Sequence, residues 1–275
     1  MRYKKNLHQA VLKALKFKGG MLALVAAMTA GTAVAGPIVT DWNYTISGAF
    51  DTTAGATTFT TGKGGCQSVT ATGITWGECP DGPPVPGSRR SGITITDTPG
   101  SGSVQTGGIG VGANTYTHFN NVLSADTLRE AHVLSTLSLT ATNPVGAVFG
   151  PTTLTYQIDF KETTNATPCL ATSPAGNPCN DIFVLSGALD NYILVDGNTY
   201  LVTLFDTNGG LDILPDAVCA AAGAGSGCLG ITTPEGTSTA IAFDMRITAV
   251  PEPASLALFS LGALGLGLIR RRRSS

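Results

Sequence analysis

Apolar and polar residues alternate with a period of two through most of the chain between residues 36 and 250, where helical periodicity is nearly absent. Because successive side chains of a β-strand point to opposite faces, this pattern predicts strands that bury one face. Glycine- and proline-rich loops separate the strands, which favours antiparallel sheets packed face to face. The sequence therefore predicts an all-β fold, an antiparallel, jelly-roll-like β-sandwich. The alternating apolar positions are Trp42, Tyr44 and Ile46; Ile93 and Ile95; Val133, Leu137 and Leu139; Leu154, Tyr156, Ile158 and Phe160; and Ile241, Phe243, Met245 and Ile247.

One hairpin is visible in the sequence. Strands are expected over 192–195 and 200–205, and Asp196-Gly197 between them accepts the positive φ angles of a tight turn. Residues 80–91 and 217–230 are expected to be loops. Neither resembles a domain linker, so we expect one sandwich domain over 36–249, a length that suits a single core.

Six cysteines fall into three pairs of near neighbours. In an exported chain an even number indicates disulfides, and pairing by proximity is one of fifteen possible connectivities. A zinc site is the alternative, but no C-x-x-C motif occurs. The pairs favoured by proximity are Cys66 with Cys79, Cys169 with Cys179, and Cys219 with Cys228.

The first 35 residues have the three parts of a secretory signal peptide. A basic segment from Arg2 to Lys18 precedes a short apolar segment from Met21 to Met28, and Ala33 and Ala35 form an A-x-A cleavage site. We therefore expect export through the Sec translocon and cleavage by signal peptidase. The first cysteine is Cys66, which excludes a lipid-anchored cysteine at the new N-terminus.

The other end of the chain also has three parts, over residues 250–273. Pro251, Glu252 and Pro253 form a stiff, extended segment, and the sixteen uncharged residues 254–269 follow it. As a helix these sixteen residues span roughly 24 Å, which is just enough to cross a membrane when the flanking basic side chains snorkel. Basic residues resist translocation and should stay cytoplasmic. They are Arg270, Arg271, Arg272 and Arg273.

These features together resemble the PEP-CTERM sorting signal. The signal would have its motif at 250–253, a transmembrane helix at 254–269 and a basic stop at 270–273. The resemblance implies export from a Gram-negative bacterium and an inner-membrane-anchored precursor that an exosortase processes near Pro251, Glu252 and Pro253. It also implies a mature form at the cell surface or outside the cell, associated with exopolysaccharide and biofilm. A plain C-terminal anchor helix is the alternative.

A second resemblance rests on Thr117, His118 and Asn120. Their T-H-x-N pattern is similar to the element that names the THxN family of PEP-CTERM proteins, and residues 36–249 would then be the family domain. Membership implies no activity. His118 can be a polar residue satisfied at a strand end, or the motif can recognise a sugar hydroxyl.

Between residues 36 and 250 the chain carries six basic and seventeen acidic residues, a formal charge of −11. A surface of this sign excludes nucleic acid as an expected partner. Trp42 and Trp76 are either core residues or stacking platforms for sugars.

Catalytic motifs are scarce. No G-x-S-x-G nucleophile elbow occurs, and we expect a protein that is not an enzyme and needs no cofactor. A carbohydrate-active hydrolase is an alternative function, but sequence spacing selects no pair from its candidate carboxylates. The candidates are Asp159, Glu162, Asp181, Asp190 and Asp244.

A calcium-dependent glycan-binding adhesin is a further alternative. Asp206, Asn208 and Asp212 place oxygen ligands around glycines after an expected strand and form a weak calcium candidate. The other interpretation of this segment is an Asx-rich turn that connects two strands.

Overall fold

The computed structural model describes residues 36–80, 82–171 and 179–251. This part of the chain is almost entirely β-structure, with one short helix. The elements are β1 (Asp41–Phe50), β2 (Thr57–Phe59), β3 (Ser68–Thr70), β4 (Gly73–Gly77), β5 (Arg90–Thr96), β6 (Gly100–Gln105), β7 (Val111–Asn120), β8 (Leu128–Asn143), β9 (Val145–Lys161), β10 (Asp181–Ser186), β11 (Asp190–Val195), β12 (Asn198–Asp206), β13 (Asp212–Ile213), α1 (Asp216–Ala222), β14 (Leu229–Thr233) and β15 (Thr237–Val250).

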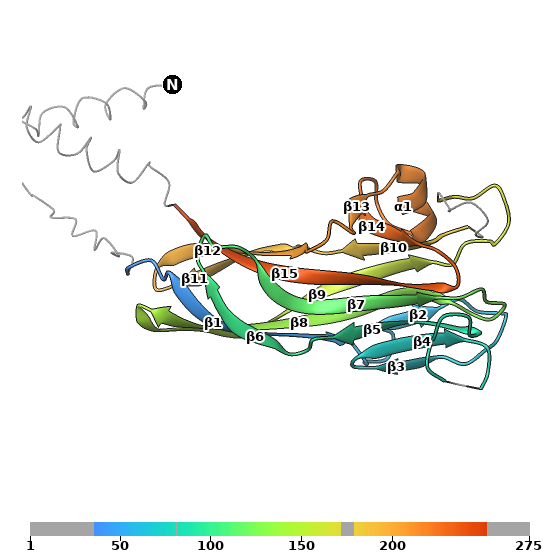
Figure 1. Ribbon diagram of the computed structural model, residues 1–275, viewed down its shortest axis with the longest axis horizontal. Coiled ribbons are helices and arrows are strands. Elements are labelled where there is room, and N and C mark those ends of the chain that lie inside the picture. The colour runs from blue at the N-terminus through green and yellow to red at the C-terminus, as the bar shows by residue number, and fades with distance from the viewer. Residues whose placement is uncertain (1–35, 81, 172–178, 252–275) are drawn as a thin grey trace, which may run out of the picture. The chain divides into compact units, whose positions relative to one another are not determined.

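The strands form two antiparallel sheets (Figure 1). Sheet A has the order β13-β14-β10-β9-β8-β1-β6, with β2 paired to β8, and sheet B has the order β11-β12-β15-β7-β5-β4-β3. The expectation of an all-β fold with antiparallel sheets is confirmed. The jelly-roll comparison stays a prediction.

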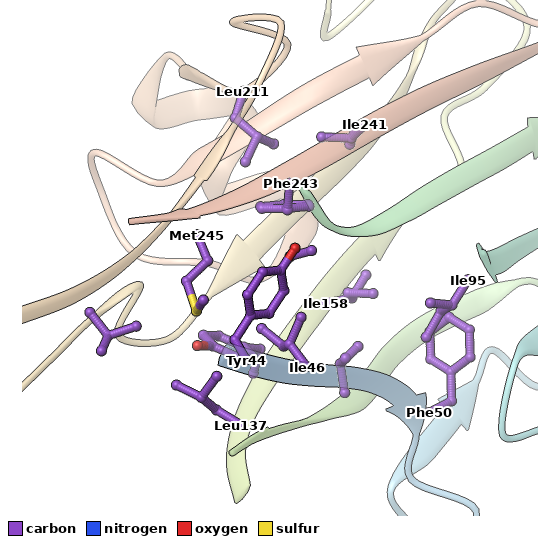
Figure 2. Packing of buried hydrophobic residues seen from close by; sticks show 14 of the residues in the cluster. Tyr44, Ile46, Phe50, Ile95, Leu137, Ile158, Leu211, Ile241, Phe243 and Met245 are labelled. Atoms are coloured by element: carbon purple, nitrogen blue, oxygen red, sulfur yellow. The ribbon is translucent and has the colours of Figure 1, made fainter. Parts of the chain in front are cut away.

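One hydrophobic core draws side chains from both sheets. Figure 2 shows Tyr44 and Ile46 of β1, in sheet A, directed toward Phe243 and Met245 of β15, in sheet B. Burying a side chain of this size contributes about 1.5–3 kcal/mol, so period-two alternation on these strands decides which face turns inward.

Both tryptophans are core residues. Trp42 and Trp76 have no exposed surface, so the core alternative is confirmed and the sugar-stacking alternative is wrong. The indole nitrogen of Trp42 donates a hydrogen bond to Thr106 Oγ1 at 2.9 Å, and the Trp42 ring meets the edge of Tyr200 with 5.2 Å between ring centroids.

The predicted hairpin is confirmed as β11 and β12. Val195 pairs with Asn198 across the turn, and Asp196 and Gly197 between them adopt φ angles of 49° and 80°. Both angles are positive, as a type I′ turn requires, and an Asp-Gly pair accepts them best.

The predicted loop over 217–230 is wrong in part, because α1 occupies 216–222. The helix is alanine-rich and ends at Gly223, which has a φ of 89°. Val218 and Cys219 are buried, and the Cys219–Cys228 disulfide ties the helix to the start of β14. This local tertiary contact holds a helix too short to be stable alone.

The predicted signal peptide, with Ala33 and Ala35, lies outside the described residues, as do Glu252 and Pro253, the transmembrane helix at 254–269 and the basic stop at 270–273. Within residues 36–80, 82–171 and 179–251, no helix has the length and apolar character needed to cross a membrane. The described chain ends with β15 at Val250, followed by the exposed Pro251.

Candidate functional site

The T-H-x-N residues lie on β7, a central strand of sheet B. His118 and Asn120 are two positions apart, so both point into the core, whereas Thr117 points to the other face and is only partly buried. His118 is 2% exposed and Asn120 has no exposed surface. Their spacing therefore places two polar side chains together inside the sandwich.

Both side chains bind one residue of the opposite sheet. His118 Nδ1 lies 3.0 Å from Thr233 Oγ1, and Asn120 Nδ2 donates to the Thr233 carbonyl oxygen at 2.8 Å. Thr233 is the last residue of β14 in sheet A and is fully buried. The motif thus joins the two sheets through polar contacts inside the core.

Two aromatic rings pack against His118. Trp76 of β4 stacks on the imidazole at 5.9 Å between centroids, and Phe160 of β9 meets it edge-on at 5.1 Å. Burial lowers the pKa of His118 to about 3, so the imidazole is neutral at physiological pH. A side chain enclosed in this way does not reach an external sugar.

Thr233 connects the motif to a second group of buried polar residues. It pairs with Asp181, the first residue of β10. Asp181 Oδ1 accepts a hydrogen bond from the backbone N–H of Thr163 at 2.8 Å, and Thr163 Oγ1 donates to the carbonyls of Cys179 and Asn180, both at 3.1 Å. The end of β9 and the start of β10 are therefore fixed to each other beside Thr233.

Three carboxylates meet here, from Glu162, Asp181 and Glu235, and we call this group the carboxylate cluster. One oxygen of each lies within 4.8 Å of the others. Glu162 follows β9, Asp181 opens β10, and Glu235 lies in the turn between β14 and β15. Both carboxylate oxygens of Glu162 are buried, and Asp181 has no exposed surface.

The electrostatics of the cluster follow from burial and like charge. Loss of hydration raises the pKa of Glu162, and the neighbouring Asp181 and Glu235 charges raise it further. Desolvation also raises the pKa of Asp181, although the Thr163 N–H opposes this, and it raises the pKa of Glu235 to about 6. Without a compensating positive charge, the cluster therefore retains protons that exposed carboxylates lose.

A surface pocket of about 330 Å³ lies beside the cluster. Glu162 lines it together with Glu130 and Asp159, and residues 220–223 at the end of α1 form part of its wall. Asp159 accepts hydrogen bonds from Gln157 Nε2 at 2.7 Å and Ser186 Oγ at 3.1 Å. Glu162 is thus both a wall of this pocket and a member of the cluster.

The disulfide prediction is confirmed at all three positions, Cys66–Cys79, Cys169–Cys179 and Cys219–Cys228. The second disulfide closes part of the segment between Glu162 and Asp181. It therefore limits how far these two carboxylates can move apart.

The weak calcium candidate on the β12–β13 connection is arranged as a turn. Asp206 Oδ2 accepts hydrogen bonds from the backbone N–H groups of Gly210 and Leu211, as in an Asx-rich turn. Asn208 and Asp212 are exposed. Hydrogen bonds from the turn itself thus engage the Asp206 carboxylate.

Sequence reasoning found the cluster only in part. Glu162 and Asp181 stand among the five hydrolase candidates, but Glu235 does not. The three residues are far apart in the chain, and only the pairing of β10 with both β9 and β14 brings them together. One sequence signal could have brought Glu162 and Asp181 together: they flank Cys169 and Cys179, the two cysteines of a predicted disulfide.

Comparison with known proteins adds one finding about the chain's far end. A family model described as the PEP-CTERM protein-sorting motif matches residues 249–273, beginning in the last two residues of β15. No curated protein matches the chain. Residues 249–273 are thus a PEP-CTERM motif, which implies that the chain is an exported protein targeted to an exosortase of the Gram-negative type.

Proposed function

We propose that the mature chain is a non-catalytic component of the cell surface or extracellular matrix, associated with exopolysaccharide and biofilm. The observation that carries this proposal is the PEP-CTERM motif at 249–273, joined directly to a folded sandwich. Processing near Pro251 would release all of β15, which ends at Val250. The cargo is therefore a complete sandwich, braced by three disulfides.

The proposed route has two processing steps. Signal peptidase cleaves after Ala35, and residues 254–269 then hold the precursor in the inner membrane with Arg270 to Arg273 in the cytoplasm. The exosortase acts on the segment from Pro251 to Pro253. The exposed position of Pro251 immediately after a strand end supports the accessibility of this segment.

The absence of catalysis is part of the same proposal. A general acid or base must come within hydrogen-bond reach of its substrate. Glu162 and Asp181 bury the carboxylate oxygens that would have to do so. In the proposed THxN-type domain, His118 and Asn120 serve to join the two sheets, in keeping with their contacts to Thr233.

Deletion of the gene tests this role. We expect the deletion strain to form less matrix-bound polysaccharide and weaker biofilm, measured as sugar retained per cell. The intact gene should restore both, whereas a version that lacks residues 251–275 should not. An unchanged biofilm in the deletion strain would contradict the proposal.

A carbohydrate-active hydrolase is the second candidate, because Glu162 and Asp181 come together beside the pocket at the end of α1. Release of soluble sugar from purified exopolysaccharide, abolished by Glu162→Gln, would favour the enzyme. Binding on a glycan array without turnover, and only with calcium present, would favour the adhesin.

A further inference from the structure

We propose that Glu162, Asp181 and Glu235 bind a hard divalent cation, Ca²⁺, inside the sandwich. Each residue supplies a carboxylate oxygen from a different part of sheet A or its connections, at the ends of β9, β10 and β14. This site is separate from the Asp206 turn and goes beyond the proposed surface role.

The spacing of the oxygens fits one shared ion. The three ligand oxygens lie within 4.8 Å of one another. Ca²⁺ binds oxygen at about 2.3–2.6 Å, so two of its ligands are at most about 5 Å apart. Three oxygens at this spacing can contact the same ion without a rearrangement of the strands.

Burial without hydrogen-bond donors is an independent observation that points to a cation. Asp181 has no exposed surface, and its Oδ2 accepts no hydrogen bond from a described N–H or O–H group. Both Glu162 oxygens are likewise buried, and within the described residues the side-chain contact of Glu162 is with the Asp181 carboxyl group. Two buried carboxyl groups that face each other must either keep a proton or bind a cation, and a bound metal ion supplies the positive charge.

The described residues around Asp181 orient its carboxylate and supply no ion pair to it. The Thr163 N–H donates to Oδ1 and orients the carboxylate, and Oδ2 has no described hydrogen-bond donor from outside the cluster. Within the described residues neither Glu162 nor Asp181 forms an ion pair with a basic side chain. The nearby charge of Lys63 acts on Glu162 without forming such a pair.

The donor set selects the type of metal. All three ligands are carboxylate oxygens, which suit Ca²⁺ rather than zinc or copper. His118 is not part of the cluster, and its Nδ1 faces Thr233. Glu162 also lines the neighbouring pocket, so a movement of this side chain would connect the cluster with solvent and with water that completes the coordination shell.

Calorimetric titration of the full chain tests the proposal, with the protein held in detergent and first treated with EDTA. CaCl₂ should release or absorb heat with saturable binding. At a hundredfold excess over Kd, the melting temperature should rise by about 5–10 °C. Glu162→Gln and Asp181→Asn should each weaken binding at least about tenfold, since ligand charge sets affinity.

A matched control separates the two acidic regions. Asp212→Asn removes one exposed carboxylate from the β12–β13 connection and should leave the calcium affinity unchanged. Binding that survives both cluster variants but is lost with Asp212→Asn would overturn the proposal. So would a wild-type chain that shows neither heat nor a change in melting temperature.

A second measurement, the melting temperature in EDTA and in calcium, tests the site even if a variant is less stable than the wild type. In EDTA, Glu162→Gln replaces a carboxyl group that keeps its proton with a neutral amide and should melt close to the wild type, whereas in saturating calcium it should melt below it. A difference in melting temperature that appears only with calcium is specific to a bound cation. A variant that shifts the melting temperature equally in both conditions would contradict the site.

Discussion

At the scale of single residues, His118 shows how the T-H-x-N pattern acts in this fold. The imidazole packs against Trp76 and Phe160, and its Nδ1 lies 3.0 Å from Thr233 Oγ1 of the other sheet. From the sequence, the motif was interpreted as the element that names a family domain. The sequence left open whether His118 was a polar residue satisfied at a strand end or recognised a sugar. Burial excludes contact with an external sugar, and within the described residues Nδ1 has a hydrogen-bond partner whereas Nε2 has none.

The buried state of His118 predicts a pH dependence of stability. Its pKa is about 3 in the fold, against about 6.5 in an unfolded chain, so below pH 6.5 the unfolded state binds a proton that the folded state does not. His118 therefore lowers the free energy of unfolding as pH falls from 6.5 toward 3. One proton corresponds to about 1.4 kcal/mol per pH unit.

The variant His118→Gln isolates this effect. Its difference from the wild type in free energy of unfolding, measured by urea denaturation, should shrink by about 2 kcal/mol between pH 7 and pH 5. Between pH 7 and pH 8.5 the difference should stay constant, which serves as the internal control. A difference that does not change between pH 7 and pH 5 would show that the imidazole takes up protons in the fold.

At the scale of elements, strands were predictable wherever one face is buried. The alternating runs predicted from sequence coincide with β1, β5, β8, β9 and β15, all of which contribute to the common core. Period-two patterning carries this information locally. The short strands β2, β3 and β13 have two or three residues each and contain too few positions to show a period.

The helix and the carboxylate cluster were not predictable in the same way. Residues 216–222 contain four alanines and are followed by Gly223, which favours a helix, but seven residues are too few to show helical periodicity, and the disulfide and buried contacts hold them in place. The cluster depends on pairing between strands that are distant in the chain. Spacing along the sequence therefore could not select Glu162 and Asp181 from the other acids or add Glu235.

The β11–β12 turn yields a prediction for an element. Gly197 has a φ of 80°, which costs a side-chain-bearing residue about 1–2 kcal/mol. Gly197→Ala should lower the free energy of unfolding by about this amount in chemical denaturation. Gly112→Ala is the matched control, since a Cβ at that position meets nothing within 4 Å and the effect should be near zero. Equal effects of the two substitutions would argue against a type I′ turn.

At the scale of the whole molecule, the folded sandwich and the sorting motif are adjacent in the chain. The motif begins at residue 249 and β15 ends at Val250. β15 lies between β12 and β7 in sheet B, and Val250 pairs with Thr199. Cleavage before Val250 would therefore remove paired residues from a central strand, whereas cleavage after it would leave the sheet complete.

The most direct test of this account is the mass of the mature protein's C-terminus. Protein collected outside exosortase-positive cells should end between Pro251 and Pro253, which keeps β15 whole and removes residues 254–275. In a strain without exosortase, the chain should stay with the membrane and still end at Ser275. Extracellular protein that ends at Ser275, or within residues 237–249, would contradict the account.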